Sequence, residues 1–158
     1  MRIHARHYLI AAIGLLPVAA LAAGSGTCTY KDKKNTFTDA IVFQKPDPFE
    51  KGKKETTIAL STEKIDVAKF KASDDADMAL LSMDGGKIQL TLGDGGVTML
   101  YAYFPPGSNI SNSGGPYGDL KLSRNDASGM AGTFTLKGKE ADDVSCDVKF
   151  DAPLIAHK

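Results

Sequence analysis

The feature that most limits what this chain can fold into is a strict two-residue alternation of apolar and polar side chains near its middle. Ile88, Leu90 and Leu92 would lie on one face of a strand, with polar residues between them on the other. The turn sequence GDGG at 93–96 follows, and its glycines tolerate positive φ angles. The next segment, 97–104, is apolar on both faces. We therefore predict a hairpin whose second strand lies at the centre of a sheet.

Further strand-like segments, rich in threonine, aromatic and β-branched residues, flank this hairpin. They cover 27–30, 36–43, 56–60, 119–124, 130–137 and 144–150, and the first two are expected to pair as a hairpin. One short helix is expected from Asp74 to Ser82, with Ser73 as its N-cap, and a further helical turn near 66–71. The chain therefore predicts an all-β fold with one short helix, as a small antiparallel barrel or sandwich of seven or eight strands.

The two cysteines, Cys28 and Cys146, lie at opposite ends of this strand-rich region. In the last predicted strand Val144, Cys146, Val148 and Phe150 alternate with polar residues, so Cys146 should point into the core. An even cysteine count in an exported chain favours a disulfide. We expect a Cys28–Cys146 disulfide that closes the fold, with the first and last strands either neighbours in one sheet or facing each other across the core.

The N-terminus has the pattern of an export signal. A basic start is followed by an apolar run over 8–21, and Ala20 and Ala22 supply the small residues that signal peptidase requires. The run is shorter than the roughly 20 residues that span a bilayer. We expect residues 1–22 to be a cleaved secretory signal peptide and 23–158 to form a single β-rich domain. The protein would then be bacterial and periplasmic or secreted, with no membrane span in the mature chain.

The sequence also disfavours a lipoprotein and a nucleic-acid-binding protein. Lipid attachment at Cys28 would need a leucine-type residue three positions earlier, where Ser25 stands, so the protein is not expected to be a lipoprotein. The whole chain has 19 basic and 19 acidic residues. Arg2 and Arg6 are lost with the signal, so the mature chain keeps 17 basic residues and has no basic stripe. Nucleic acid is therefore not an expected partner.

Enzyme chemistry has little support in the sequence. After removal of the signal the only histidine is His157, next to the C-terminus, where backbone is usually frayed. A serine or cysteine nucleophile would therefore lack a rigidly held histidine base. Phosphate-loop and zinc-type spacings are also missing, and the acidic cluster at 74–77 lacks the spacing of a calcium loop. We expect a non-catalytic protein without a metal or a cofactor.

The segment 105–118, PPGSNISNSGGPYG, is the strongest candidate for a functional site. It is longer than an ordinary hairpin connection, and loops of this length are commonly functional. Aromatic residues stand at both of its ends, with hydroxyl and amide groups between them, as in loops that recognise proteins. The alternative is a flexible connection. The residues expected to bind a protein partner are Ser108, Asn109, Ser111, Asn112, Ser113 and Tyr117.

Within this segment, Ser113-Gly114-Gly115-Pro116-Tyr117 has the spacing Ser-Gly-x-x-Tyr. This spacing resembles the loop motif of the bacterial periplasmic lysozyme inhibitors, which are small exported β-domains. The resemblance covers these five residues. It implies that Ser113 would contact the catalytic carboxylates of a glycosidase and that Tyr117 would shape the loop.

Two other functions fit the same fold class. In the first, the barrel would hold a small apolar ligand, lined by Met99, Tyr101, Tyr103 and Phe104, although such residues are more often ordinary core. In the second, the protein would be a structural component of the cell envelope. The leading expectation is an exported binding protein that recognises a protein partner, such as a glycosidase, through 105–118.

Overall fold

The structure, a computed structural model, describes residues 23–138 and 143–157. The expected signal peptide, 1–22, lies outside the described residues. Ten strands and two short helices follow one another along the chain. They are β1 (Ala23–Tyr30), β2 (Lys33–Thr36), β3 (Asp39–Pro46), β4 (Lys54–Ser61), α1 (Val67–Ala72), α2 (Ala76–Leu81), β5 (Lys87–Gly93), β6 (Gly96–Phe104), β7 (Ser108–Ser113), β8 (Asp119–Asp126), β9 (Gly129–Leu136) and β10 (Val144–Ile155).

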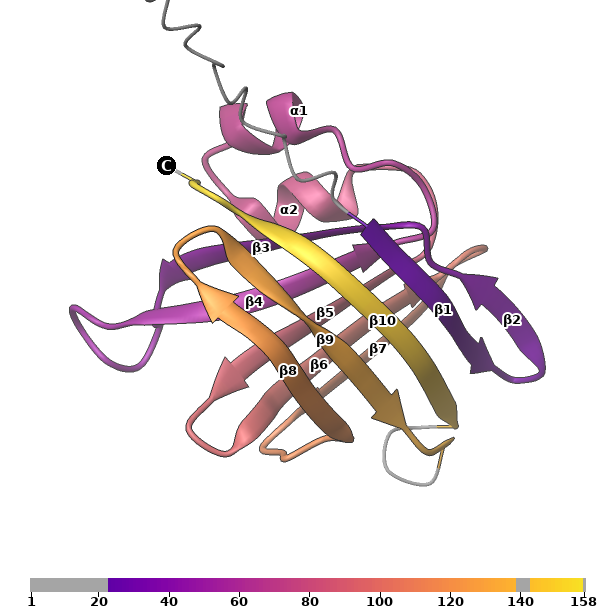
Figure 1. The fold of residues 1–158 in the computed structure, drawn as a ribbon. Coiled ribbons are helices and arrows are strands. Elements are labelled where there is room, and N and C mark those ends of the chain that lie inside the picture. The colour runs from indigo at the N-terminus through magenta and orange to yellow at the C-terminus, as the bar shows by residue number, and fades with distance from the viewer. Residues whose placement is uncertain (1–22, 139–142, 158) are drawn as a thin grey trace, which may run out of the picture.

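The strands form two layers that face each other. Sheet A has the order β2-β1-β10-β9-β8, and sheet B has the order β3-β4-β5-β6-β7. Figure 1 shows sheet A in front of sheet B, with strands that cross, and both helices above the strands. The all-β fold expected from the sequence is confirmed, and a sandwich describes the arrangement of its layers.

The last strand, β10, belongs to both sheets. Along most of its length it pairs antiparallel with β1 and β9. Beyond Pro153 it passes into sheet B, where Leu154 pairs with Val42 and Ile155 with Phe43 in parallel. The expected antiparallel sandwich therefore holds in outline, with ten strands in place of seven or eight and with one parallel pairing, between β10 and β3. The sequence pattern cannot show that one long strand serves two sheets.

The expected Cys28–Cys146 disulfide is present. The two cysteines are direct cross-strand partners on β1 and β10, and both side chains are buried. Near this link β1 is packed very closely, because a Cβ on Gly26 would clash with the backbone of Asp147. Gly26 has φ +110 and its carbonyl accepts a hydrogen bond from the N–H of Phe37 at 3.0 Å. Glycine is required at this position because a Cβ would clash and because other residues rarely adopt this positive φ.

Pairing near the N-terminus differs from the expected hairpin of 27–30 with 36–43. The segment 27–30 pairs instead with β2, through a turn at Lys31 and Asp32, both of which have positive φ. The residues of β3 then cross to sheet B and pair with β4. The sequence had suggested a longer polar connection after residue 30. The turn contains only Lys31 and Asp32, and the polar residues that follow, from Lys33, form β2.

The main core fills the space between the two sheets. Its buried side chains come from eight strands and from Phe37 between β2 and β3, and the largest are fully buried phenylalanines such as Phe134 and Phe150. On β6 the buried residues of this core are Val97, Leu100, Ala102 and Phe104. Burial of these side chains, at about 25 cal/mol per Å² of apolar surface, is the main source of stability for such a sandwich.

A second, smaller core lies on the opposite face of sheet B. Ile41 and Phe43 of β3 and Ala59 of β4 pack there against Phe70 of α1 and Leu80 of α2. There are two short helices, α1 where a helical turn was expected near 66–71 and α2 within the helix expected from Asp74 to Ser82, and each has an aspartate N-cap. Asp66 accepts from the N–H of Lys69 at the start of α1, and Asp75 rather than Ser73 caps α2.

The disulfide indicates that the protein is located outside the cytoplasm, since disulfides rarely persist in reducing compartments. Among the residues that the structure describes, no helix has the length and the apolar character needed to cross a bilayer.

Removal of the disulfide should strongly destabilise the fold. The bond closes a loop with a sequence separation of 118 residues. The chain-entropy relation for such a loop gives about 4 to 5 kcal/mol. We expect Cys28→Ala with Cys146→Ala to lower the free energy of unfolding by that amount, measured by urea denaturation. A loss below about 1 kcal/mol would contradict the assigned role of this bond.

A buried carboxylate should prove important for holding the helical segment on sheet B. Asp39 accepts from the N–H of Ala40 at 2.9 Å and, with its other oxygen, from the N–H of Ile65 at 2.8 Å. Asp39→Asn removes one acceptor and should cost about 1 to 3 kcal/mol of stability in thermal or urea unfolding. The matched control is Asp66→Asn, where asparagine caps a helix as well as aspartate does. Equal effects of the two substitutions would disprove this assignment.

Candidate functional site

The segment 105–118 is not a long loop, and that prediction was wrong. Residues 108–113 form β7, which pairs antiparallel with β6 from Phe104↔Ser108 to Met99↔Ser113. Its only apolar residue, Ile110, is buried in the main core. A strand of serines and asparagines has weak intrinsic preference for β-structure, so it forms here because the backbone of β6 supplies its hydrogen-bond partners.

The four residues expected to line a ligand cavity lie on two opposite faces of β6. Phe104 points into the main core, where its ring stacks on Tyr30 with centroids 5.6 Å apart. Met99, Tyr101 and Tyr103 alternate with the core residues and are half-buried on the outer face. These four residues therefore do not line one cavity.

The same outer face carries part of the set expected to bind a protein partner. In the register of β6 with β7, Tyr103 pairs with Asn109, Tyr101 with Ser111 and Met99 with Ser113. In the register with β5, Tyr101 pairs with Gln89 and Met99 with Thr91. Directly paired residues share a face. We call this surface the tyrosine face, and it consists of Gln89, Thr91, Met99, Tyr101, Tyr103, Asn109, Ser111 and Ser113.

Exposure rises across the tyrosine face toward the edge of sheet B. Gln89 and Thr91 on β5 are buried, the three residues of β6 are half-buried, and Asn109, Ser111 and Ser113 on β7 are exposed. The smaller core under the helices takes its strand residues from β3, β4 and the end of β10, and none from β6 or β7. The helical layer therefore leaves this part of the outer face uncovered.

Two residues of the tyrosine face, Gln89 and Thr91, were not identified as site residues from the sequence. Four that were identified lie outside it, namely Phe104, Tyr117, Ser108 and Asn112. Gln89 and Thr91 alternate with the core residues of β5. This alternation could have shown from the sequence that they lie on the outer face of the sheet. Ser108 and Asn112 pair with core residues of β6 and are only partly exposed. They do not belong to the tyrosine face.

Tyr101 is fixed in position by a hydrogen bond across the face. Its hydroxyl donates to Oδ1 of Asn109 at 2.9 Å. Burial raises the pKa of the Tyr101 hydroxyl, and the neighbouring Tyr103 adds to this effect. The hydroxyl therefore stays protonated and remains a donor. The ring presents an apolar surface beside a polar tip, a combination that favours contact with a protein.

The five-residue motif at the end of β7 forms a compact turn. The N–H groups of Gly114 and Gly115 both donate to the carbonyl of Thr98, at 3.1 and 3.2 Å. The Tyr117 hydroxyl donates to the carbonyl of Ser113 at 2.8 Å, which closes the turn. The Ser113 side chain itself is exposed at the edge of the tyrosine face. Tyr117 therefore shapes the turn, and Ser113 is accessible on it.

A buried lysine lies next to the tyrosine face but serves the fold. Lys87 pairs with Tyr103 in the β5–β6 register and is 2% exposed. Its ammonium donates to the carbonyls of Met83, Asp84 and Gly85 at 2.5, 2.7 and 3.0 Å. An ammonium group has three donors, so none is left for a ligand.

The described residues offer little for acid–base or metal chemistry. His157 was expected to be frayed, but it is half-buried with its ring 4.9 Å from that of Phe70. No group of three or more His, Cys, Asp or Glu residues in the described part could hold a metal ion. The acidic cluster at 74–77 contains the cap of α2 and an ion pair between Asp77 and Lys45.

Comparisons of the chain with protein-family models, with curated proteins and with solved structures find no match. The resemblance to lysozyme inhibitors therefore rests on the sequence of residues 113–117 alone.

The Tyr117 hydroxyl should contribute to stability where the Tyr103 hydroxyl does not. Tyr117→Phe removes the hydrogen bond to Ser113 and should lower the free energy of unfolding by about 1 kcal/mol. Tyr103 is also half-buried but makes no side-chain hydrogen bond within the described structure, so Tyr103→Phe is the matched control. Urea unfolding of both variants measures the difference. Equal stabilities would show that the turn does not depend on this bond.

Proposed function

We propose that the protein is an exported, non-catalytic binding protein that recognises a protein partner through the tyrosine face and the turn at 113–117. The observation that carries the proposal is that apolar and aromatic side chains of β6 lie next to hydrogen-bonding side chains of β7 on one exposed face. Met99, Tyr101 and Tyr103, chosen from the sequence for their apolar surface, lie directly beside Asn109, Ser111 and Ser113, chosen for their hydrogen-bonding groups.

The outer face of sheet A provides an internal comparison. Its exposed residues on β9 and β10 are short or charged, and they include Thr133, Thr135, Ser145, Asp147 and Lys149. Protein-binding surfaces are enriched in tyrosine and methionine and depleted of lysine, aspartate and serine, so Met99, Tyr101 and Tyr103 count for the tyrosine face and its two serines do not. By this criterion sheet B carries the candidate interface and sheet A carries ordinary solvated surface.

The rigidity of the tyrosine face also favours a role in binding. Its residues are on paired strands rather than on a mobile loop, and Tyr101 is tethered to Asn109. Little side-chain freedom is then lost on association, which improves affinity for a given contact area. Tyrosine adds large contact area at low entropic cost.

Glycosidases are the first class of partner to test. The resemblance of 113–117 to the lysozyme-inhibitor motif assigns the contact with the enzyme to Ser113, and this side chain is exposed at the edge of the tyrosine face. The turn is held by three hydrogen bonds from backbone N–H groups to the carbonyls of Thr98 and Val97. The turn is therefore preformed and offers the exposed serine to a partner.

The two alternative functions have less support. A ligand-binding barrel would need a shared cavity, whereas Phe104 is part of the core and the other three expected lining residues face outward. A structural role in the cell envelope makes no use of the uncovered tyrosine face.

Export fits the disulfide, and it should be tested by sequencing the N-terminus of the secreted protein, with Ala23 as the expected first residue.

The test of the proposal is loss of partner binding in a variant that keeps the fold. Tyr101→Ala with Tyr103→Ala removes both rings, and loss of such anchors costs about 2 kcal/mol or more, which is roughly a 30-fold loss of affinity. The readout is pull-down of partners from periplasmic extract, followed by titration and a lysozyme-activity assay. Thr133→Ala with Thr135→Ala, on the outer face of sheet A, is the matched control.

Circular dichroism and urea unfolding should show that both double variants remain folded. Binding that survives loss of both tyrosines would rule out the tyrosine face as the interface. Binding without inhibition of lysozyme would retain the binding role and exclude that enzyme as the target.

A further inference from the structure

The strands at the edges of the sheets differ in how well they are protected against pairing with another chain. Among the described strands, pairing ends at β2, at β7 and at β8. An edge strand offers a row of unpaired N–H and C=O groups to any extended segment that approaches it. Proteins protect such edges with very short strands, charged side chains or bulges.

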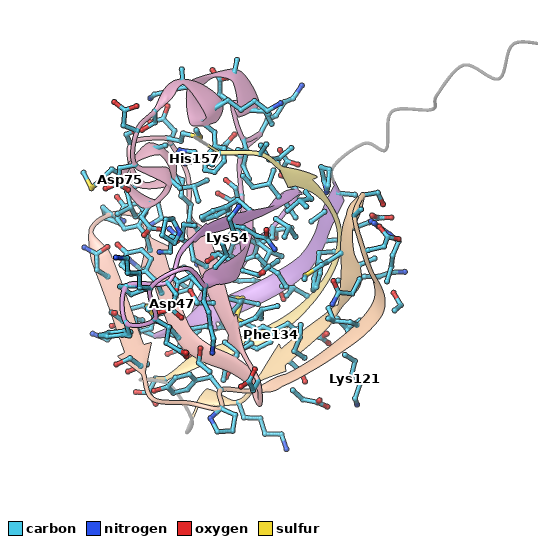
Figure 2. All side chains as sticks on the ribbon, turned by 90° about the vertical axis from the view of Figure 1, so that its left-hand side faces the viewer. Asp47, Lys54, Asp75, Lys121, Phe134 and His157 are labelled. Carbon is cyan, nitrogen blue, oxygen red and sulfur yellow. A yellow bond between two sulfur atoms is a disulfide. The ribbon has the colours of Figure 1, made fainter. Side chains whose placement is uncertain are left out.

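The edges at β2 and β8 have this protection. β2 consists of four residues, of which Lys33 and Lys34 are exposed lysines. β8 carries four charged residues, and its register with β9 shifts between Leu122 and Arg124. Figure 2 shows Lys121 of β8 directed away from the body of the molecule, and its side chain is 75% exposed. The short length, the charges and the irregular register disfavour an added strand on these edges.

The edge at β7 has none of these features. The strand has six residues, SNISNS, without a charge or a proline, and its register with β6 is regular from Ser108 to Ser113. The flanking segments 105–107 and 114–118 are uncharged as well. This edge is therefore the one among the three that is suited to accept a further strand.

The backbone groups that point outward from β7 belong to residues of the tyrosine face. The N–H of Gly114 donates to the carbonyl of Thr98 at 3.1 Å, which identifies these two residues as a hydrogen-bonded pair. Hydrogen-bonded pairs alternate with non-hydrogen-bonded pairs along antiparallel strands, so Asn112 and Ile110 are the next residues that bond to β6. The residues whose N–H and C=O groups face the open edge are therefore Asn109, Ser111 and Ser113.

Most of these outward groups are unpaired. The carbonyl of Ser113 accepts from the Tyr117 hydroxyl at 2.8 Å. The outward N–H and C=O groups of Asn109 and Ser111 have no hydrogen-bond partner within the described structure. They recur at every second residue, about 7 Å apart along a strand. The ligand that matches donors and acceptors at this spacing is an extended polypeptide backbone.

A side chain of β7 provides a second, independent sign that a partner is missing. Nδ2 of Asn112 is buried and has no hydrogen-bond partner among the described residues. A buried donor without an acceptor is costly. Directly paired residues share a face, so a strand added to β7 would place a side chain next to Asn112. A hydroxyl or amide oxygen on that side chain would accept from Nδ2.

On the opposite face, Tyr101 extends toward the same edge. Its hydroxyl starts from β6 and reaches Oδ1 of Asn109 on β7 at 2.9 Å. Ser111 and Ser113, which also lie on this face of β7, have small side chains and are exposed. They leave room for a large side chain of an added strand to contact the tyrosine ring. Such contacts favour apolar or aromatic residues at alternate positions of the added strand.

We propose that the partner of the tyrosine face binds through an extended segment that adds to β7 as a further strand of sheet B. Large apolar side chains of this segment lie at alternate positions over the tyrosine face, and a hydroxyl or amide side chain lies beside Asn112. The proposal rests on the proposed function, and it adds that main-chain hydrogen bonds at the edge of β7 supply part of the affinity.

The test uses the mature, disulfide-bonded protein and a phage-displayed library of linear peptides of about ten residues, the upper length of ordinary strands. We expect selection of peptides with apolar residues at alternate positions. Their affinity for Ser111→Pro should be lower than for Ser111→Ala by about tenfold or more. Both variants lack the hydroxyl, but proline also lacks the outward N–H. Equal affinities of the two variants, or a library without binders, would overturn the proposal.

Ser111→Pro should fold, because the N–H that it removes makes no bond to β6 and proline is tolerated at such edge positions. Circular dichroism checks this. Amide hydrogen exchange of the wild type, followed by nuclear magnetic resonance, gives a measurement that needs no variant. The N–H groups of Asn109 and Ser111 should exchange rapidly in the free protein and slowly with the selected peptide. The N–H of Ile110 bonds to β6 and is the internal control, slow in both states. Unchanged exchange at Asn109 and Ser111 would contradict strand addition.

The same variants separate this proposal from the proposed function. A protein partner that is lost with Tyr101→Ala and Tyr103→Ala but retained by Ser111→Pro would overturn strand addition and leave the tyrosine face as the interface. A partner lost only with Ser111→Pro would disprove the tyrosine face and support strand addition. Slow exchange at Ser111 in the free protein, together with twice the mass of one chain in sedimentation equilibrium, would assign the edge to a second copy and overturn the proposal.

Discussion

The strand on which the rest of the structure depends is β10. It pairs with β1 and β9 in sheet A, continues into sheet B beside β3, and is bonded to β1 through Cys28 and Cys146. The two layers are therefore joined along one strand as well as through the core between them. Because the disulfide links the first strand to the last, it restricts the unfolded chain over most of the domain.

This arrangement decides which surfaces are left for binding. The end of β10 and the two short helices cover the outer face of sheet B over β3 and β4, where Ile41, Phe43 and Phe70 form the smaller core. The helical segment is too short to extend over β6 and β7 as well. The outward residues of those strands are consequently exposed, and they are the tyrosines and small polar residues to which we assign partner binding.

The tyrosine face combines half-buried rings with small polar neighbours on paired strands. Rigid rings of this kind supply contact area at low entropic cost, and the polar neighbours supply hydrogen bonds.

The sequence by itself determined the faces of the strands and the pairing of Cys28 with Cys146, because alternation of apolar residues reports burial locally and only two cysteines were present. It could not decide which apolar face of β6 would enter the core. It also could not reveal that 108–113 is a strand or that this strand ends the pairing order of sheet B. These outcomes depend on hydrogen-bond partners and packing contributed by residues distant in the chain, so only the tertiary structure decided them.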